Sequence, residues 1–262
     1  MADVLSNRLR ELIDHKPSAL GTFITLGDPV SVELAGLAGF EFIVIECEHA
    51  GLSLETVQNH LRAARARGLG TLVRVPAGDH GFVQRVLDIG AEGVLVPHVS
   101  DATAAVRAVS GVRFPPDGHR GMYPSSAAAA FGAHGLPGVR ELTQALNRNT
   151  VLAVMIEEAS AVDQIEQIAA TPGVDLVVVG PSDLSASLGV IGDPRDPRLA
   201  AAVGRVFKAC REAGVKFGMP VDHGGYRLSA AELREQGAWF LTGGSDSVFL
   251  LNAFRASVKA HS

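Results

Sequence analysis

Cysteine and lysine are scarce in this chain of 262 residues, and each scarcity excludes a kind of chemistry. The two cysteines, Cys47 and Cys210, are too few for a disulfide framework, so a reducing compartment is expected. Cys47 stands between acidic neighbours, which raise the pKa of a thiol and argue against a nucleophilic role. None of the lysines follows a predicted strand, so a mechanism through a lysine Schiff base lacks its amine.

Long apolar runs and an excess of positive charge are missing as well. No apolar run approaches the ~18 residues that a membrane span needs, and the first 20 residues carry charges where a signal peptide has its apolar core. The formal net charge is −5, which gives no electrostatic support for binding nucleic acid or a membrane surface. We therefore expect a soluble, cytoplasmic protein that binds neither.

Short apolar runs, by contrast, recur throughout the chain. Six of them closely follow a glycine, as happens when a helix ends in a left-handed glycine and the next strand begins. These six runs are Phe42–Ile45, Leu72–Val73, Val94–Val96, Leu176–Val179, Val215–Met219 and Trp239–Leu241. Two more, Gly21–Leu26 and Val151–Ile156, lack the glycine and bring the predicted strands to eight.

Helical patterns lie between the predicted strands, and an amphipathic segment precedes the first one. Regular alternation of strand and helix favours one (β/α)8 TIM barrel over residues 1–262, with a doubly wound open sheet as the structural alternative. Residues 112–149 form a connection that is too long for a plain unit. Such excursions are typical of functional covers or subunit contacts.

Acidic residues follow two consecutive predicted strands, where a barrel of this kind places its active site. Glu157 ends the fifth strand, and Asp183 follows Gly180 and Pro181 after the sixth. Two carboxylates in a dry mouth repel each other unless a cation neutralises them. An all-oxygen set favours Mg²⁺ or Mn²⁺ over zinc. The alternatives are an ion pair with a nearby arginine, or a helix cap by Asp183 or Ser182.

A guanidinium and an imidazole are also predicted at this end of the barrel. Arg74 ends the third strand, where it could bind a substrate carboxylate or stabilise an enolate, or form a structural salt bridge with Glu48 or Glu157. His49 is a candidate general base, although a histidine in such a loop is more often an ordinary surface residue. Asp88 ends a predicted helix and would approach His49 only through an unusual closure of the barrel.

Six runs, in this order and spacing, link these residues to a known family. They are Gly39–His49, Val73–Pro76, Leu95–Pro97, Arg113–Gly121, Met155–Glu157 and Val179–Ser185. Together they resemble the HpcH/HpaI family of metal-dependent (class II) pyruvate aldolases, over residues 20–255. The resemblance implies an enzyme that reversibly cleaves a 4-hydroxy-2-oxo acid into pyruvate and an aldehyde, with oxaloacetate decarboxylation as a side activity.

The resemblance also implies a cofactor and a set of roles. A divalent metal (Mg²⁺ or Mn²⁺, with Co²⁺ as a further option) would be chelated by pyruvate, whose carboxylate would accept from backbone N–H groups at a helix start. Arginine would stabilise the enolate, and a histidine tuned by Asp88 and the Glu46 region would move the hydroxyl proton. The site residues implied are His49, Arg74 and Asp88 for catalysis, Gly180, Ser182, Asp183 and Arg74 for substrate, and Glu157 and Asp183 for the metal.

A homo-oligomer is implied too, namely a hexamer built as a trimer of dimers that exchange their C-terminal helices. Two departures from some family members stand near the site, because Glu46 replaces Asp and Met155 replaces Gln. Ser126–Phe131 lacks an arginine for a second carboxylate, which favours a neutral or small aldehyde. The alternative functions are an acyl-CoA lyase of the citryl or malyl type and a non-catalytic ligand-binding barrel.

Overall fold

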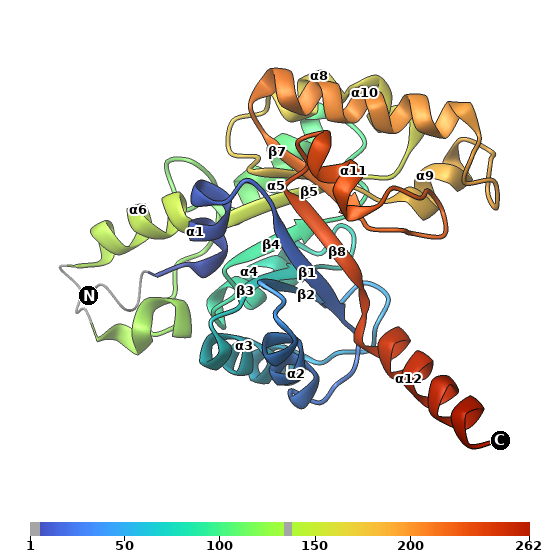
Figure 1. The fold of residues 1–262 in the computed structure, drawn as a ribbon. Helices are drawn as coiled ribbons and strands as arrows, with labels where there is room; N and C mark the ends of the chain where they lie inside the picture. The colour runs from blue at the N-terminus through green and yellow to red at the C-terminus, as the bar shows by residue number, and fades with distance from the viewer. Residues whose placement is uncertain (1–5, 134–137) are drawn as a thin grey trace.

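Eight parallel strands close into a barrel in the computed structural model, which describes residues 6–133 and 138–262 (Figure 1). Each strand pairs with the next one in sequence, and β8 pairs with β1. The (β/α)8 prediction is confirmed and the open sheet is excluded. The strands are β1 (Ala19–Ile24), β2 (Phe42–Glu46), β3 (Gly70–Arg74), β4 (Gly93–Val96), β5 (Val151–Ile156), β6 (Leu176–Val179), β7 (Lys216–Pro220) and β8 (Phe240–Ser245).

Helices surround the barrel, and the predicted helix over 159–169 is split in two at Gln164. Residues 1–5 of the expected N-terminal helical segment lie outside the described residues. The helices are α1 (Arg8–His15), α2 (Val30–Ala38), α3 (Leu54–Arg67), α4 (His80–Asp88), α5 (Ala102–Val112), the 3₁₀ helix η2 (Ala127–Gly132), α6 (Val139–Asn149), α7 (Ala159–Asp163), α8 (Ile165–Ala169), α9 (Pro181–Ser187), α10 (Pro197–Ala213), α11 (Ala230–Glu235) and α12 (Asp246–His261).

The strands bury side chains on both faces, because alternate residues of a strand point to opposite sides. One face packs against the helices. The other fills the barrel with Phe42, Val44, Leu72, Leu95, Val151, Ala153, Met155, Leu176, Val178 and Phe240. Residues two positions further along a strand point to the same side. The residues two positions after the last interior residue of β2, β3, β5 and β6 are Glu46, Arg74, Glu157 and Gly180. The alternation that fills the core therefore also aims these four positions into the barrel mouth.

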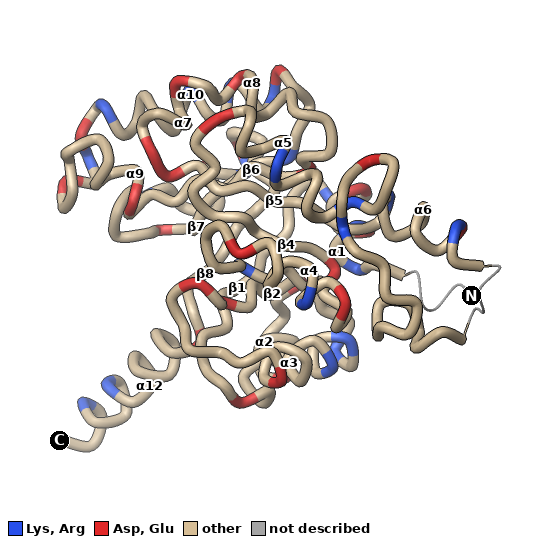
Figure 2. The backbone as a smooth tube through the Cα atoms, turned by 180° about the vertical axis from the view of Figure 1, so that it is seen from behind, with Lys and Arg blue, Asp and Glu red and all other residues tan. Residues whose placement is uncertain are grey.

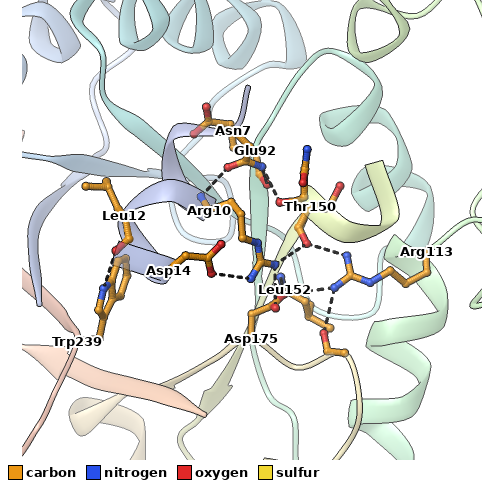
Figure 3. A network of polar contacts seen from close by, with 12 residues as sticks. Asn7, Arg10, Leu12, Asp14, Glu92, Arg113, Thr150, Leu152, Asp175 and Trp239 are labelled. Carbon is orange, nitrogen blue, oxygen red and sulfur yellow. Dashed lines mark hydrogen bonds and ion pairs between the residues drawn. The ribbon is translucent and has the colours of Figure 1, made fainter. Parts of the chain in front are cut away.

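The amino end of the barrel is closed by α1. Its buried Leu9, Leu12 and Ile13 belong to the same apolar cluster as the barrel interior. Polar contacts hold the helix there: the Glu92 carboxylate accepts from the backbone N–H groups of Arg8 and Leu9, and the Arg10 side chain reaches Thr150 and Asp175, just before β5 and β6 (Figure 3). The barrel interior is therefore closed at this end by α1 and opens at the carboxyl end.

At the other end of the chain, α12 projects away from the barrel in both views (Figures 1 and 2). None of its 16 residues is buried. Only its first turn is anchored, since Asp246 accepts hydrogen bonds from the N–H groups of Thr25 and Leu26 on the β1 side of the mouth. In the part of the chain that the structure describes, no helix is long and apolar enough to cross a membrane.

Candidate active site

A cavity of about 790 Å³ opens at the carboxyl end of the barrel. It brings together most of the residues that the sequence indicated, although they come from four different βα units. His49, Arg74, Glu157, Gly180, Ser182 and Asp183 all line it. Glu157 and Asp183 therefore line the same cavity, and no arginine among the described residues forms an ion pair with either of them.

Glu157 is the most deeply buried acid of this cavity, with an exposed fraction of 2%. Burial raises the pKa of its carboxyl, and the nearby carboxylates of Glu48 and Asp183 raise it further, against a hydrogen bond from the His98 backbone N–H. That N–H donates to Oε1 over 2.7 Å. The backbone thus orients Oε1 of Glu157. A bound cation would stabilise the negative charge that burial makes unfavourable on this carboxylate.

Gly180 makes room for this carboxylate. A β-carbon at position 180 would lie 2.9 Å from Glu157 Oε2 and 3.1 Å from Glu157 Cβ, which is closer than side chains pack. Pro181 then begins α9 directly, so the residues after it lie within the first helical turn. The predicted cap by Ser182 or Asp183 is wrong, because Gly180 is the N-cap residue and no side chain caps this helix.

Glu157 and Asp183 suit a hard divalent cation. Within the described ranges, no three His, Cys, Asp or Glu side chains gather so as to hold a metal by themselves. A site with one or two carboxylates, completed by water and substrate oxygens, is the kind that Mg²⁺ uses. The chemistry of the donors and the destabilised charge of Glu157 therefore fit such an ion.

Arg74 is held by two acids of β2 and the loop after it. Glu46 and Arg74 stand opposite each other in the β2–β3 register, and their side chains form an ion pair with an Nη2–Oε2 distance of 2.5 Å. Glu48 lies 3.5 Å from Arg74 Nε, whereas Glu157 makes no contact with it among the described contacts. The guanidinium is thus fixed with one side toward the cavity, where Met155 Sδ lies 3.8 Å from Nη1.

His49 stands at the cavity rim, with 63% of its side chain exposed. Glu46 does not form a dyad with its imidazole. Instead, Oε1 of Glu46 accepts the backbone N–H groups of Glu48 and His49 and thereby shapes the loop. The acid nearest to the imidazole is Glu48, 3.7 Å from Nε2.

Asp88 is not brought to His49 within this chain. Helices of a (β/α)8 barrel run antiparallel to the strands, so the C-terminal residue of α4 lies toward the amino end of the barrel. There Asp88 accepts a hydrogen bond from buried Arg120 over 2.8 Å. The geometry of the single chain thus speaks against the expected pairing of Asp88 with His49.

The Ser126–Phe131 stretch is also far from the site. Most of it lies in η2, against a second cavity of about 800 Å³ that is shared with α1 and residues 90–92 at the amino end. Its lack of arginine therefore does not bear on the cavity at the carboxyl end of this chain, and the preference for a neutral aldehyde stays a prediction. Arg113 and Arg120, in the same long excursion, turn inward to Asp175 and Asp88.

Sequence reasoning did not assign His98 to the site, and it named Glu48 only as an alternative salt-bridge partner of Arg74, a contact that the structure confirms. Glu48, with only 9% of its side chain exposed, lies within 3.5–3.7 Å of Arg74, His49 and His98 and so joins three groups of the mouth. His98 adopts a left-handed backbone with φ of 53°, which aims its N–H at Glu157. Glu48 stands two residues after Glu46, and residues two apart in an extended segment point to the same side, so the spacing indicates Glu48. No sequence feature marks the left-handed backbone at His98.

Cys47 behaves as its neighbours indicated. Burial, together with the charge of Glu46, raises the pKa of its thiol to about 12. The thiol is therefore protonated at neutral pH and is no nucleophile.

Comparison with known proteins finds relatives that match nearly the whole chain. A 5-keto-4-deoxy-D-glucarate aldolase of Enterobacter sp. (strain 638) is 34% identical over 259 residues, which span 98% of this chain and 96% of that protein. The crystal structure of an HpcH/HpaI aldolase/citrate lyase family protein from Burkholderia cenocepacia J2315 superposes with a TM-score of 0.88 at 36% identity, covering 97% of this chain and 99% of the other.

An HpcH/HpaI aldolase from Desulfitobacterium hafniense DCB-2 gives a TM-score of 0.88 at 31% identity, with 97% and 96% of the two chains covered. The family described as HpcH/HpaI aldolase/citrate lyase matches residues 19–253, which include every strand of the barrel. With the closed barrel and the acids of its mouth, these matches show that the chain belongs to the HpcH/HpaI aldolase/citrate lyase family.

Proposed function

We propose that this protein is a divalent-metal-dependent aldolase that reversibly splits a 4-hydroxy-2-oxo acid into pyruvate and an aldehyde. The observation that carries the proposal is the buried Glu157 carboxylate, seated over Gly180 in the cavity that Asp183 also lines. A relative named as a 5-keto-4-deoxy-D-glucarate aldolase, 34% identical along nearly the whole chain, supports a carbon–carbon lyase.

Glu157 and Asp183 would hold the cation. When bound, Mg²⁺ or Mn²⁺ supplies Lewis-acid chemistry at the 2-oxo group of the substrate. The first N–H groups of a helix have no acceptor within that helix. Those of Ser182 and Asp183, at the start of α9, are therefore available for the substrate carboxylate.

Arg74 and His49 supply the remaining groups. Because Glu46 and Glu48 hold the guanidinium in place, Arg74 can donate to the developing enolate oxygen without reorganising. His49, exposed at the rim and 3.7 Å from Glu48, would take the hydroxyl proton as the carbon–carbon bond breaks. Decarboxylation of oxaloacetate needs the same enolate and is expected as a side activity.

Metal removal and one substitution test this function. Exhaustive chelation should abolish cleavage, and added Mg²⁺ or Mn²⁺ should restore it. Asp183→Asn removes the charge from one proposed ligand and should lower kcat/KM by at least about 100-fold. Asp193→Asn, an exposed acid that does not line the cavity, is the matched control. Turnover that survives chelation, or an Asp183→Asn variant as active as the wild type, would refute the proposal.

A further inference from the structure

The loop after β7 forms one wall of the mouth and is tied down at several points. The Val221 N–H donates to Thr242, and the Asp222 N–H to Leu228, which closes the loop on itself. Asp222 has a positive φ of 47°, a left-handed conformation that few non-glycine residues adopt. Asp222 and His223 both line the cavity. The loop therefore presents two polar side chains from a fixed backbone.

This loop also rests on the start of α9. A β-carbon on Gly225 would lie 3.0 Å from the Pro181 carbonyl oxygen and 3.2 Å from the Ser182 nitrogen. The two backbones are in direct contact, so Asp222 and His223 lie next to the site proposed for the pyruvate half. They are in reach of the other half of the same substrate.

The hydrogen bonds of His223 determine its tautomer. Its Nδ1 accepts the Gly225 N–H over 3.0 Å, and burial lowers the pKa of the imidazole. A neutral imidazole that accepts at Nδ1 carries its proton on Nε2. That N–H has no acceptor among the described residues, so it is available as a donor to a ligand.

The charges that line the cavity are unbalanced. Arg74 is the one Lys or Arg among its described lining residues, and it is already paired with Glu46. Glu157 and Asp183 are the proposed cation ligands, which leaves Asp222 as an acid without a cationic partner there. A second carboxylate on the substrate would face this negative charge, whereas a hydroxyl group can donate to Asp222 and accept from His223.

We infer that the aldehyde half of the substrate is an uncharged hydroxyaldehyde whose hydroxyl groups are bound by Asp222 and His223. The inference rests on the proposed aldolase function and specifies its substrate class. It makes these two residues specificity determinants: Asp222 rejects carboxylate-bearing aldehydes, and His223 distinguishes a hydroxyl from a hydrogen atom.

The test compares three acceptors in aldol addition to pyruvate: D-glyceraldehyde, propionaldehyde, which lacks the hydroxyls, and succinic semialdehyde, which carries a carboxylate. In the wild type, kcat/KM for glyceraldehyde should exceed both others at least tenfold. Asp222→Asn should raise the succinic semialdehyde to glyceraldehyde ratio about tenfold. His223→Phe should reduce the glyceraldehyde to propionaldehyde ratio to near one. Ratios between acceptors cancel a general loss of active enzyme.

Asp193→Asn is the control and should keep the wild-type ratios, because its carboxylate does not line the cavity. Exchange of the pyruvate C3 protons with D₂O, followed by NMR on wild-type protein with Mg²⁺ and no aldehyde, tests the aldolase function separately. If the wild-type protein shows no exchange and forms no aldol product, the aldolase function is overturned, and this inference falls with it. Exchange together with a preference for succinic semialdehyde, or with ratios unchanged in both loop variants, would overturn the inference alone.

Discussion

At the scale of single residues, the site depends on how closely the Glu157 carboxylate approaches the backbone of Gly180. The two come from neighbouring strands, and their contact leaves no space for a side chain at position 180. The φ of Gly180 is −94°, so glycine is needed here for space and not for an unusual backbone. A substitution at position 180 therefore tests the packing against the Glu157 carboxylate without adding backbone strain.

Gly180→Ala should weaken cation binding about 10- to 100-fold, the range seen when groups that orient a metal ligand are changed. The added methyl group would push the Glu157 carboxylate away from the His98 N–H that orients it. Calorimetric titration with Mn²⁺ measures the affinity without relying on turnover. Gly204→Ala, in the middle of α10, where the new carbon would meet nothing within 4 Å beyond the adjacent backbone of its own helix, should bind Mn²⁺ like the wild type. Equal affinity in a folded Gly180→Ala variant would contradict this role.

At the scale of secondary-structure elements, α1 and the amino ends of the strands are joined by a partly buried ionic network (Figure 3). Asp175, just before β6, accepts from Arg10 of α1 over 2.8 Å and from Arg113, after α5, over 3.3 Å. It also accepts the backbone N–H of Leu152 on β5. One carboxylate therefore links three parts of the chain that are distant in sequence.

Asp175→Ala should lower the free energy of unfolding by about 3 kcal/mol, because buried Arg113 loses its counterion and Arg10 keeps only the longer contact with Asp14. Urea denaturation followed by fluorescence of Trp239 measures this. That indole is buried beside α1, where its N–H donates to the Leu12 carbonyl.

Asp163→Ala removes an exposed pair with Arg205 and should cost no more than about 1 kcal/mol. If both variants were equally stable, the network would not be what secures α1.

At the scale of the whole molecule, α12 is the element that the single chain leaves uncovered. It extends from the barrel with Val248, Phe249, Leu250, Leu251, Phe254 and Val258 all exposed. A helix with this much exposed apolar surface is typical of one that packs against another chain. We expect a second copy to cover it, as the exchange of C-terminal helices implied by the family resemblance would require.

Phe254→Asp should shift the protein from an oligomer toward the 27.3 kDa chain, since it places a charge on a surface that we expect to be buried. Light scattering coupled to size-exclusion chromatography gives the mass. Ser257→Asp, on the same helix but already polar and exposed, should retain the assembly. A wild-type protein that is monomeric at micromolar concentration would show that α12 is not an interface.

The architecture and part of the site could be predicted from the sequence because both follow local rules. Gly39 and Gly68, for example, do adopt the left-handed conformation at the ends of α2 and α3 that their positions indicated. Glu157 and Asp183 follow consecutive strands, and parallel strands bring their carboxyl ends to one edge, so the two acids share a cavity. Hydrophobic periodicity, glycines at helix ends and the order of the strands can all be read from the sequence, because none of them depends on contacts between distant residues.

Only the tertiary structure decided which charges meet. Arg74 could have paired with Glu157, but the β2–β3 register sets it opposite Glu46. Asp88 could have served His49, but the antiparallel course of α4 carries it to Arg120 at the other end. The roles of Glu48 and of the Asp222–His223 loop likewise depend on loop backbones packing across the mouth. Contacts of this kind depend on register and loop geometry, which residue type and spacing alone do not specify.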